Sequence, residues 1–201
     1  MNRSFDELEI EGKRLLNAQE FMKIQRYFQL TEDDFIIQHN HYFDTSEFQL
    51  KEQSAALRIR DKSGAYVLTL KARNEDGVME KHQPLASHEW SEGAPLTQLT
   101  NGGPVQTYLE KEWGIPFHEL HALGRLTTRR AELSYEKGLL ALDESYYFDD
   151  VDYELEYEGN SQGHVQKALT QIASRVGLDP HGTEPQPKIQ RFLSAAEGRT
   201  R

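Results

Sequence analysis

Six segments of this chain alternate between apolar and charged side chains with a period of two, and this alternation constrains the fold more than any other feature. Successive side chains of a β-strand point to opposite faces of the sheet, so each segment predicts a strand with one apolar and one ionic face. The six predicted strands are 7–13, 56–60, 65–73, 128–135, 139–145 and 152–158, and two weaker ones are 36–43 and 78–85. Eight strands are enough to close a barrel with room for a ligand.

Turn and helix signals complete the pattern. Residues 61–64 and 136–138 are short turns that join neighbouring strands as hairpins, which predicts an antiparallel sheet. Apolar residues at helical spacing predict helices at 18–29, 104–113, 164–176 and after Pro187. We therefore expect an α+β fold, an eight-stranded antiparallel β-barrel with helices packed on its outside.

Length and composition bound the class of protein. The 201 residues suit a single domain, 1–201, with helical additions around 104–124 and 164–196. The chain has no cysteine, which excludes disulfides and thiolate metal sites, and its net charge of -10 argues against nucleic-acid binding. No apolar run is long enough for a membrane span, and residues 1–13 lack the apolar stretch of a signal peptide. We expect a cytoplasmic monomer or homodimer.

The ionic faces of the predicted strands repeat one sign of charge. Glu9 and Glu11 share a face of the first strand, Arg58 and Arg60 share a face of another, and residues 154, 156 and 158 of the last strand are all glutamates. An ordinary amphipathic strand turns its ionic face to water, and a solvated face usually mixes signs. Helices need an apolar sheet surface to pack on, and if they cover the outside of a barrel, the ionic faces line its interior.

An interior with acidic and basic walls requires a ligand that screens both. Arginine and lysine suit phosphate oxygens, and clustered carboxylates suit hard divalent cations such as Mg²⁺ or Mn²⁺. A polyphosphate bridged by metal ions satisfies both walls at once. The sequence therefore favours a triphosphate-containing small molecule as the partner.

The same parity argument separates neighbouring residues. Arg130 shares a face with Thr128 and Glu132 and is predicted to point inward, whereas Arg129 shares a face with Ala131 and is predicted to point outward. Asp143 points inward by the same test. Lys188 and Arg191 are three residues apart and share a face of the last predicted helix. We expect both to face the ligand.

A signature motif and six further short motifs, in order along nearly the whole chain, resemble the CYTH domain family, also called triphosphate tunnel metalloenzymes. The first, Glu9-Ile10-Glu11-Gly12-Lys13, resembles the Glu-x-Glu-x-Lys signature of that family, although relatives often carry a larger residue where this chain has Gly12. The six other matches are Tyr42-Phe43-Asp44-Thr45, Ala56-Leu57-Arg58-Ile59-Arg60, Leu68-Thr69-Leu70-Lys71, the Arg129-Arg130 pair, Leu142-Asp143 and Tyr153-Glu154-Leu155-Glu156.

The resemblance implies roles for individual residues. The metal ligands that it implies are Glu9, Glu11, Glu154 and Glu156, with Asp143 and Glu80 as further members of the acidic set. The implied phosphate-binding residues are Lys13, Arg58, Arg60, Lys71, Arg130, Lys188 and Arg191. The residues expected to be catalytic are Glu9, Glu11, Lys13 and Lys71. The expected reaction is the Mg²⁺- or Mn²⁺-dependent hydrolysis of a terminal phosphoanhydride bond, and the expected substrate is inorganic triphosphate.

Alternative functions remain open at this point. The same family includes nucleotide cyclases and thiamine-triphosphatases, and a tunnel that only binds would be a polyphosphate or nucleotide sensor. Trp90 and Trp113 could stack on an organic group, but core packing is the simpler explanation. His39 with His41, and His118 with His121, lack the further ligands that a zinc site needs. Tyr42 and Asp44 fit a tunnel rim and a hydrogen-bonded strand end equally well.

Overall fold

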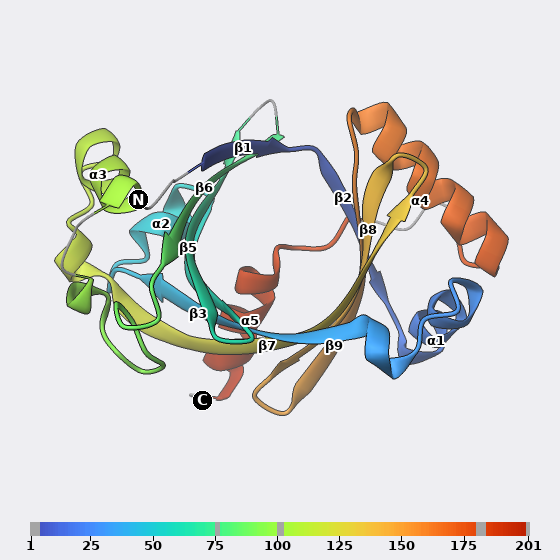
Figure 1. Ribbon diagram of the computed structural model, residues 1–201, viewed down its shortest axis with the longest axis horizontal. Helices are drawn as coiled ribbons and strands as arrows, with labels where there is room; N and C mark the ends of the chain where they lie inside the picture. Colours follow the sequence, from blue (N-terminus) through green and yellow to red (C-terminus); the bar gives the residue numbers. More distant parts are fainter. Residues whose placement is uncertain (1–4, 75–76, 100–102, 180–183, 200–201) are drawn as a thin grey trace. The chain divides into compact units, whose positions relative to one another are not determined.

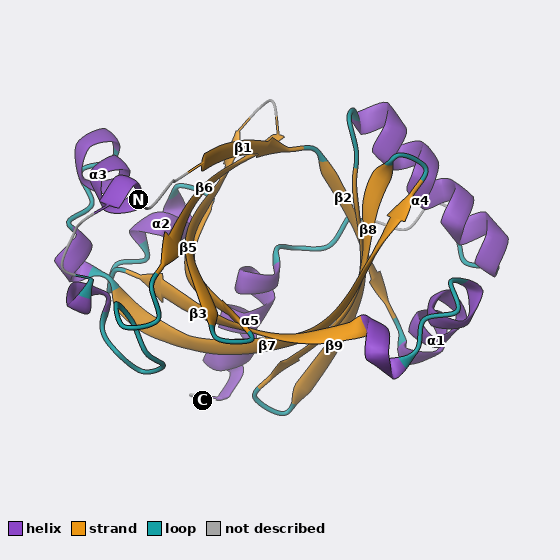
Figure 2. Cartoon of the chain, viewed as in Figure 1, coloured by secondary structure: helices purple, strands orange, loops and turns teal. Residues whose placement is uncertain are grey.

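Antiparallel strands dominate the computed structural model, which describes residues 5–74, 77–99, 103–179 and 184–199 (Figure 2). The strands are β1 Phe5–Glu9, β2 Glu11–Leu16, β3 Phe35–Asp44, β4 Ala55–Lys62, β5 Ala65–Asn74, β6 Gly77–Leu85, β7 His121–Tyr135, β8 Gly138–Tyr147 and β9 Asp150–Glu158. The helices are α1 Ala18–Tyr27, α2 Gln49–Glu52, α3 Gly103–Glu112, α4 Gln162–Val176 and α5 Lys188–Arg199, with short 3₁₀ turns at Glu32–Asp34, Leu96–Gln98 and Phe117–Glu119.

The strand order is β1-β6-β5-β4-β3-β7-β8-β9-β2 (Figure 1). The expected antiparallel sheet is confirmed, but the described residues form nine strands where eight were predicted. The predicted strand 7–13 divides at Ile10, because the part before it lies next to β6 and the part after it pairs with β9. The first and last strands of the order are thus consecutive in the chain.

Contacts divide the chain into two compact units. The first comprises residues up to Leu8 together with Gln38–Leu126, and the second comprises Glu9–Ile37 and the chain from Thr127 onward. Both weaker predicted strands, 36–43 and 78–85, are present as β3 and β6. The helical addition expected around 104–124 ends earlier, because β7 already begins at His121. In the described part of the chain, no helix combines the length and the apolarity needed to span a membrane.

Each unit has its own apolar core beneath its helices. In the first unit, Leu57 of β4 and Leu68 of β5 are fully buried against side chains that include Leu50 of α2 and Leu109 of α3. In the second unit, Leu142 of β8 and Leu155 of β9 pack with Ile172 of α4. The apolar face of these strands is therefore the face that packs against the helices, as predicted.

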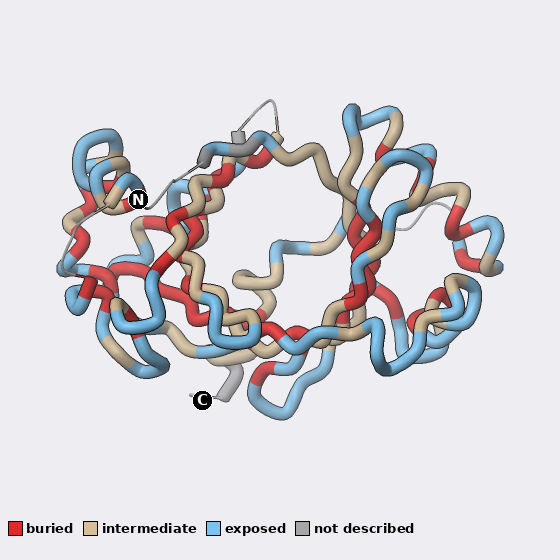
Figure 3. The backbone as a smooth tube through the Cα atoms, viewed as in Figure 1, coloured by how far each residue is buried: buried red, intermediate tan, exposed pale blue. Residues whose placement is uncertain are grey.

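The residues of the opposite face are ionic, and several of them are also shielded from water, so that buried and partly buried residues follow one another along the strands (Figure 3). Glu80 of β6 is 2% exposed, and Asp143 of β8 and Glu154 of β9 are 0% exposed. A solvated ionic face would leave these carboxylates open to water, so the ordinary amphipathic interpretation is wrong for both units.

Gly12 permits a close approach between β2 and α4. A Cβ atom at this position would lie 2.6 Å from Cγ1 of Val165 and 2.9 Å from Cδ1 of Leu169. The space that a side chain would need at position 12 is therefore taken by the helix.

We expect Gly12→Val to lower the free energy of unfolding by about 1–3 kcal/mol, because the added atoms force β2 and α4 apart. Urea denaturation measures the change. Gly163→Ala is the matched control, because a Cβ at Gly163 meets no atom within 4 Å and alanine favours the helix. A Gly12→Val protein as stable as wild type would contradict the close approach.

Candidate functional site

The ionic face of the second unit is assembled by the register of three adjacent strands. Arg130 of β7 lies directly across from Asp143 of β8, and Asp143 lies directly across from Glu154 of β9. Two residues further along β9, Glu156 lies across from Lys13 of β2. Because these residues share one parity, the antiparallel ladders place acidic and basic side chains from four strands on a single face.

Three carboxylates meet on this face. Asp143, Glu154 and Glu156 each offer one oxygen atom, and these oxygens lie within 4.8 Å of one another. All three residues are buried. Among the described residues, this is the group whose carboxylate oxygens have the spacing of a metal site. Their donor chemistry, hard anionic oxygen, suits Mg²⁺ or Mn²⁺.

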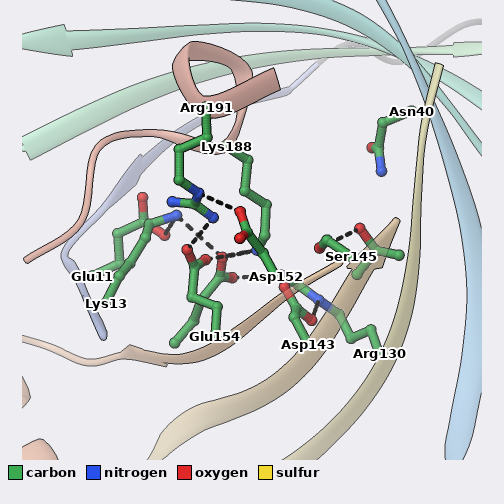
Figure 4. Close-up of polar contacts among 12 residues, drawn as sticks. Glu11, Lys13, Asn40, Arg130, Asp143, Ser145, Asp152, Glu154, Lys188 and Arg191 are labelled. Atoms are coloured by element: carbon green, nitrogen blue, oxygen red, sulfur yellow. Dashed lines mark hydrogen bonds and ion pairs between the residues drawn. The ribbon is translucent and has the colours of Figure 1, made fainter. Parts of the chain in front are cut away.

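Four cations surround the three carboxylates (Figure 4). Arg130 grips Asp143 through two hydrogen bonds of 2.6 Å and donates a third to Glu156. Lys188 of α5 contacts all three carboxylates, at 2.7 Å from Oε1 of Glu154 and 2.5 Å from Oε1 of Glu156.

The other two of these four cations are Arg191 and Lys13. Arg191 donates to Asp152 and to Glu154, each at 2.7 Å. Lys13 lies 3.1 Å from Glu11 and 3.3 Å from Glu156. The face thus holds a dense set of groups that bind either cations or phosphate oxygens.

Burial and charge set the protonation of these groups in opposite directions. Burial by itself would raise the pKa of Asp143, but the charges of Arg130 and Lys188 outweigh it and hold that pKa below its ordinary value. The same cations, with Lys13, hold the pKa of Glu156 well below its ordinary value. Burial and the neighbouring Glu156 raise the pKa of Glu154, despite the charge of Lys188. Glu154 is therefore the member of the three that takes up a proton most readily.

A separate network of polar side chains lies on β5 and β6 of the first unit. Lys71 is directly across from Glu80 and forms an ion pair with it, and Thr69 is directly across from His82. His82 contacts Oε2 of Glu80 at 3.1 Å through Nε2 and the hydroxyl of Thr69 at 3.0 Å through Nδ1. Burial would raise the pKa of Glu80, but the hydrogen bond from His82 and the charges of Lys71 and Arg58 lower it.

The predicted residues are thus distributed over the two units. Arg58 and Arg60 lie on β4 with half-buried side chains, and Arg60 donates to the side chain of Asn40 at 3.3 Å. Glu9 and Glu11, at the end of β1 and the start of β2, lie outside the group of three close carboxylates. Their predicted roles as metal ligands stay predictions.

Some polar residues of these faces were not singled out from the sequence. Asp152 accepts from Arg191 and from the hydroxyl of Tyr147, and it shares parity with Glu154. His82 shares parity with Glu80 in the same way. Parity could have identified both, whereas the hydrogen bond from Arg60 to Asn40 depends on the register between β3 and β4.

The structure separates the ambiguous residues. Arg129 points away from the carboxylates and pairs with Glu144 and Glu32, as predicted. Trp90 is 1% exposed and contacts the rings of His41 and Tyr66, so it is a core residue of the first unit. Within the described residues, no histidine belongs to a group with the spacing of a metal site.

Asp44 is a structural residue at the end of β3. Its carboxylate accepts from the backbone N–H groups of Thr45, Leu50 and Lys51, at 2.8, 2.9 and 3.1 Å. The last two belong to the first turn of α2, whose N–H groups have no partner within the helix. Asp44 therefore caps this short helix.

We expect Asp44→Ala to lower the free energy of unfolding by about 1–3 kcal/mol, because it leaves buried N–H groups without an acceptor. Asp44→Asn keeps one oxygen and should lose less. Thermal unfolding monitored by circular dichroism compares the two variants with wild type. A ranking in which Asp44→Asn is the less stable variant would contradict the capping role.

Comparisons with known proteins agree with this geometry. The family model described as CYTH domain matches residues 7–186. The Bacillus subtilis protein named "Putative triphosphatase YjbK" is 41% identical over 186 residues, which cover 92% of this chain and 94% of that protein.

Solved structures show the same similarity. A Bacillus halodurans protein described as "a putative adenylate cyclase" superposes with a TM-score of 0.86 at 38% identity, over 93% of this chain and 98% of that one. A Hippeastrum protein described as a "putative adenylyl cyclase" with "a dominant triphophatase activity" has a TM-score of 0.76 at 25% identity, over 94% of this chain and 96% of its own.

Proposed function

Because this chain belongs to the CYTH domain family, we propose that it is a divalent-metal-dependent phosphohydrolase that cleaves a terminal phosphoanhydride bond of a linear triphosphate. The observation that carries this proposal is the group Asp143, Glu154 and Glu156, three buried carboxylates within 4.8 Å that are surrounded by partly buried cations of phosphate-binding type. Carboxylates alone would suit a metal store, and cations alone would suit a phosphate carrier. Their combination suits a metal-bridged polyphosphate.

The residues present fit Mg²⁺ or Mn²⁺. We propose that Asp143, Glu154 and Glu156 hold the ion, with Glu9 and Glu11 as further ligands from β1 and β2. When bound, such an ion neutralises phosphate charge and polarises the phosphorus–oxygen bonds.

The chain's own cations position the substrate in this proposal. Arg130 and Arg191 present planar guanidinium groups that suit two phosphate oxygens at once, and Lys13 and Lys188 present compact ammonium groups. Arg58, Arg60 and Lys71 are proposed as phosphate ligands on the ionic face of the first unit. On the second unit, Lys13, Arg130, Lys188 and Arg191 together orient the triphosphate and stabilise the charge that moves onto the leaving oxygen.

One residue is assigned the proton transfer, and others are assigned to the charge of the leaving group. Glu154, whose pKa is raised by burial, is suited to orient the attacking water and accept its proton. Lys13 or Lys71 then neutralises the leaving phosphate oxygen. Glu80, through its ion pair with Lys71, holds that ammonium group in place.

Inorganic triphosphate is the proposed substrate, because the charged groups around Asp143, Glu154 and Glu156 are of the types that suit metal ions and phosphate oxygens. Cyclisation of ATP is the second candidate, since the Bacillus halodurans relative is described as "a putative adenylate cyclase". Hydrolysis of thiamine triphosphate and non-catalytic polyphosphate sensing are outcomes that the same experiment distinguishes.

The test measures phosphate release from inorganic triphosphate, ATP and thiamine triphosphate, each with Mg²⁺, Mn²⁺ or EDTA. We expect rapid, EDTA-sensitive release from inorganic triphosphate, and chromatography of the ATP reactions detects any cyclic product. No turnover of any substrate, with triphosphate binding retained, would overturn the hydrolase and favour the sensor.

A further inference from the structure

Lys188 occupies an unusual position for a helical lysine. It is the first residue of α5, yet its Nζ atom contacts Asp143, Glu154 and Glu156 together. These are the same three carboxylates whose oxygens have the spacing of a metal site. The ammonium group therefore lies at the focus of the group, where a divalent ion would also have to lie.

We infer that Lys188 and the divalent ion compete for these carboxylates, and that metal and triphosphate together move the ammonium group of Lys188 from the carboxylates to a phosphate. This inference rests on the proposed function for the identity of the ligands. The inference adds that the binding of metal and the binding of substrate are thermodynamically coupled through Lys188, which the carboxylates alone would not achieve.

Geometry and charge prevent the Lys188 ammonium group and a divalent ion from occupying the three carboxylates at the same time. Mg²⁺ requires its oxygen ligands at about 2.0–2.1 Å in a near-octahedral arrangement. The Lys188 ammonium group is already 2.7 Å from Glu154 and 2.5 Å from Glu156, and it also contacts Asp143. Two positive groups cannot share this focus, because their repulsion is strong in a buried environment. One of them must leave.

Lys188 is the cation of this network whose departure costs least. Its flexible side chain carries a point charge, whereas Arg130 is held to Asp143 by two hydrogen bonds. The helix itself has other anchors: Arg191 binds Asp152 and Glu154, and Phe192 stacks on Phe148 at a ring distance of 5.1 Å. A rotation of the Lys188 side chain is therefore sufficient, and α5 keeps its position.

Competition makes metal binding depend on the triphosphate. A divalent ion on its own must displace the ammonium group of Lys188 into a less favourable environment, which weakens its binding. A metal–triphosphate complex offers that ammonium group a phosphate oxygen instead. Metal and triphosphate should therefore bind with positive coupling, and removal of Lys188 should reduce it.

The experiment titrates Mn²⁺ into the full chain by calorimetry and by electron paramagnetic resonance, with and without a non-hydrolysable triphosphate analogue. Wild type is compared with Lys188→Met, which removes the charge and keeps most of the side chain, and with Lys188→Gln as a second variant. Lys167→Met, at an exposed position of α4, controls for loss of a positive charge. Glu154→Gln controls for binding at the site.

We expect Lys188→Met to bind Mn²⁺ about tenfold more tightly than wild type without the analogue, and the analogue to enhance its Mn²⁺ affinity less. Equal or weaker Mn²⁺ binding by both Lys188 variants, with Glu154→Gln weaker still, would overturn the competition alone. Mn²⁺ binding that Glu154→Gln leaves unchanged would instead overturn the proposed metal site. Binding measurements do not depend on turnover, so the two failures are distinguishable.

Discussion

Glu156→Gln should lower kcat for phosphate release by about 10³-fold and weaken Mn²⁺ binding in parallel. The substitution preserves shape but removes one anionic oxygen from the group of three carboxylates. Loss of a metal ligand removes several kcal/mol of transition-state stabilisation, which corresponds to this factor. Steady-state kinetics over a range of metal concentrations measures the loss, and calorimetry measures the affinity.

Glu144→Gln is the matched control for this prediction. Glu144 is a neighbour of Asp143 on β8, but its side chain points to the opposite face and pairs with Arg129 at 2.8 Å. The kcat of the Glu144→Gln enzyme should stay within about threefold of wild type, as expected for an interaction far from the reacting atoms. A Glu156→Gln enzyme that keeps near-wild-type turnover would remove Glu156 from the proposed metal site.

Arg130→Met should lower the free energy of unfolding by about 3–5 kcal/mol in metal-free buffer. Arg130 is the partner of Asp143, which is 0% exposed on its side chain, and it also binds Glu156. Removing one partner of a buried ion pair leaves an uncompensated buried charge, which costs far more than the pair itself contributes. Urea denaturation in the presence of EDTA measures the change.

Two comparisons make this result specific. Arg129→Met, one residue away on the opposite face, should cost only about 1 kcal/mol, because its partners Glu144 and Glu32 are 16% and 80% exposed and water can screen the charges left behind. The double variant Arg130→Met with Asp143→Asn should recover part of the lost stability, since the orphaned charge is removed. Equal costs at positions 129 and 130 would contradict the burial of the network.

Much of the fold and of the candidate site could be predicted from local patterns in the sequence. Alternation along single strands separated an inward Arg130 from an outward Arg129, and in the structure the two point to opposite faces, where Arg129 pairs with Glu144 and Arg130 with Asp143. It also indicated that Glu154 and Glu156 share a face. Such inferences succeed because side-chain direction in a strand depends only on the pleat, which is a local property of the backbone.

Other features depended on partners that are distant in the sequence. The division of the first predicted strand at Ile10 arises because its halves have different neighbouring strands, β6 and β9. Asp44 is a cap because α2 folds back onto the end of β3. Neither the strand partner nor the position of a short helix can be found from the period of a single segment.

The sequence by itself determined which side chains share a face, and therefore that acidic and basic groups would line the same side of the sheet. Only the tertiary structure decided which charges meet. Lys188 reaches Asp143 across 45 positions of sequence, and Arg130 reaches Glu156 across 26. These meetings require the register of β7, β8 and β9 and the docking of α5 on them, and both are set by long-range packing that no local periodicity encodes.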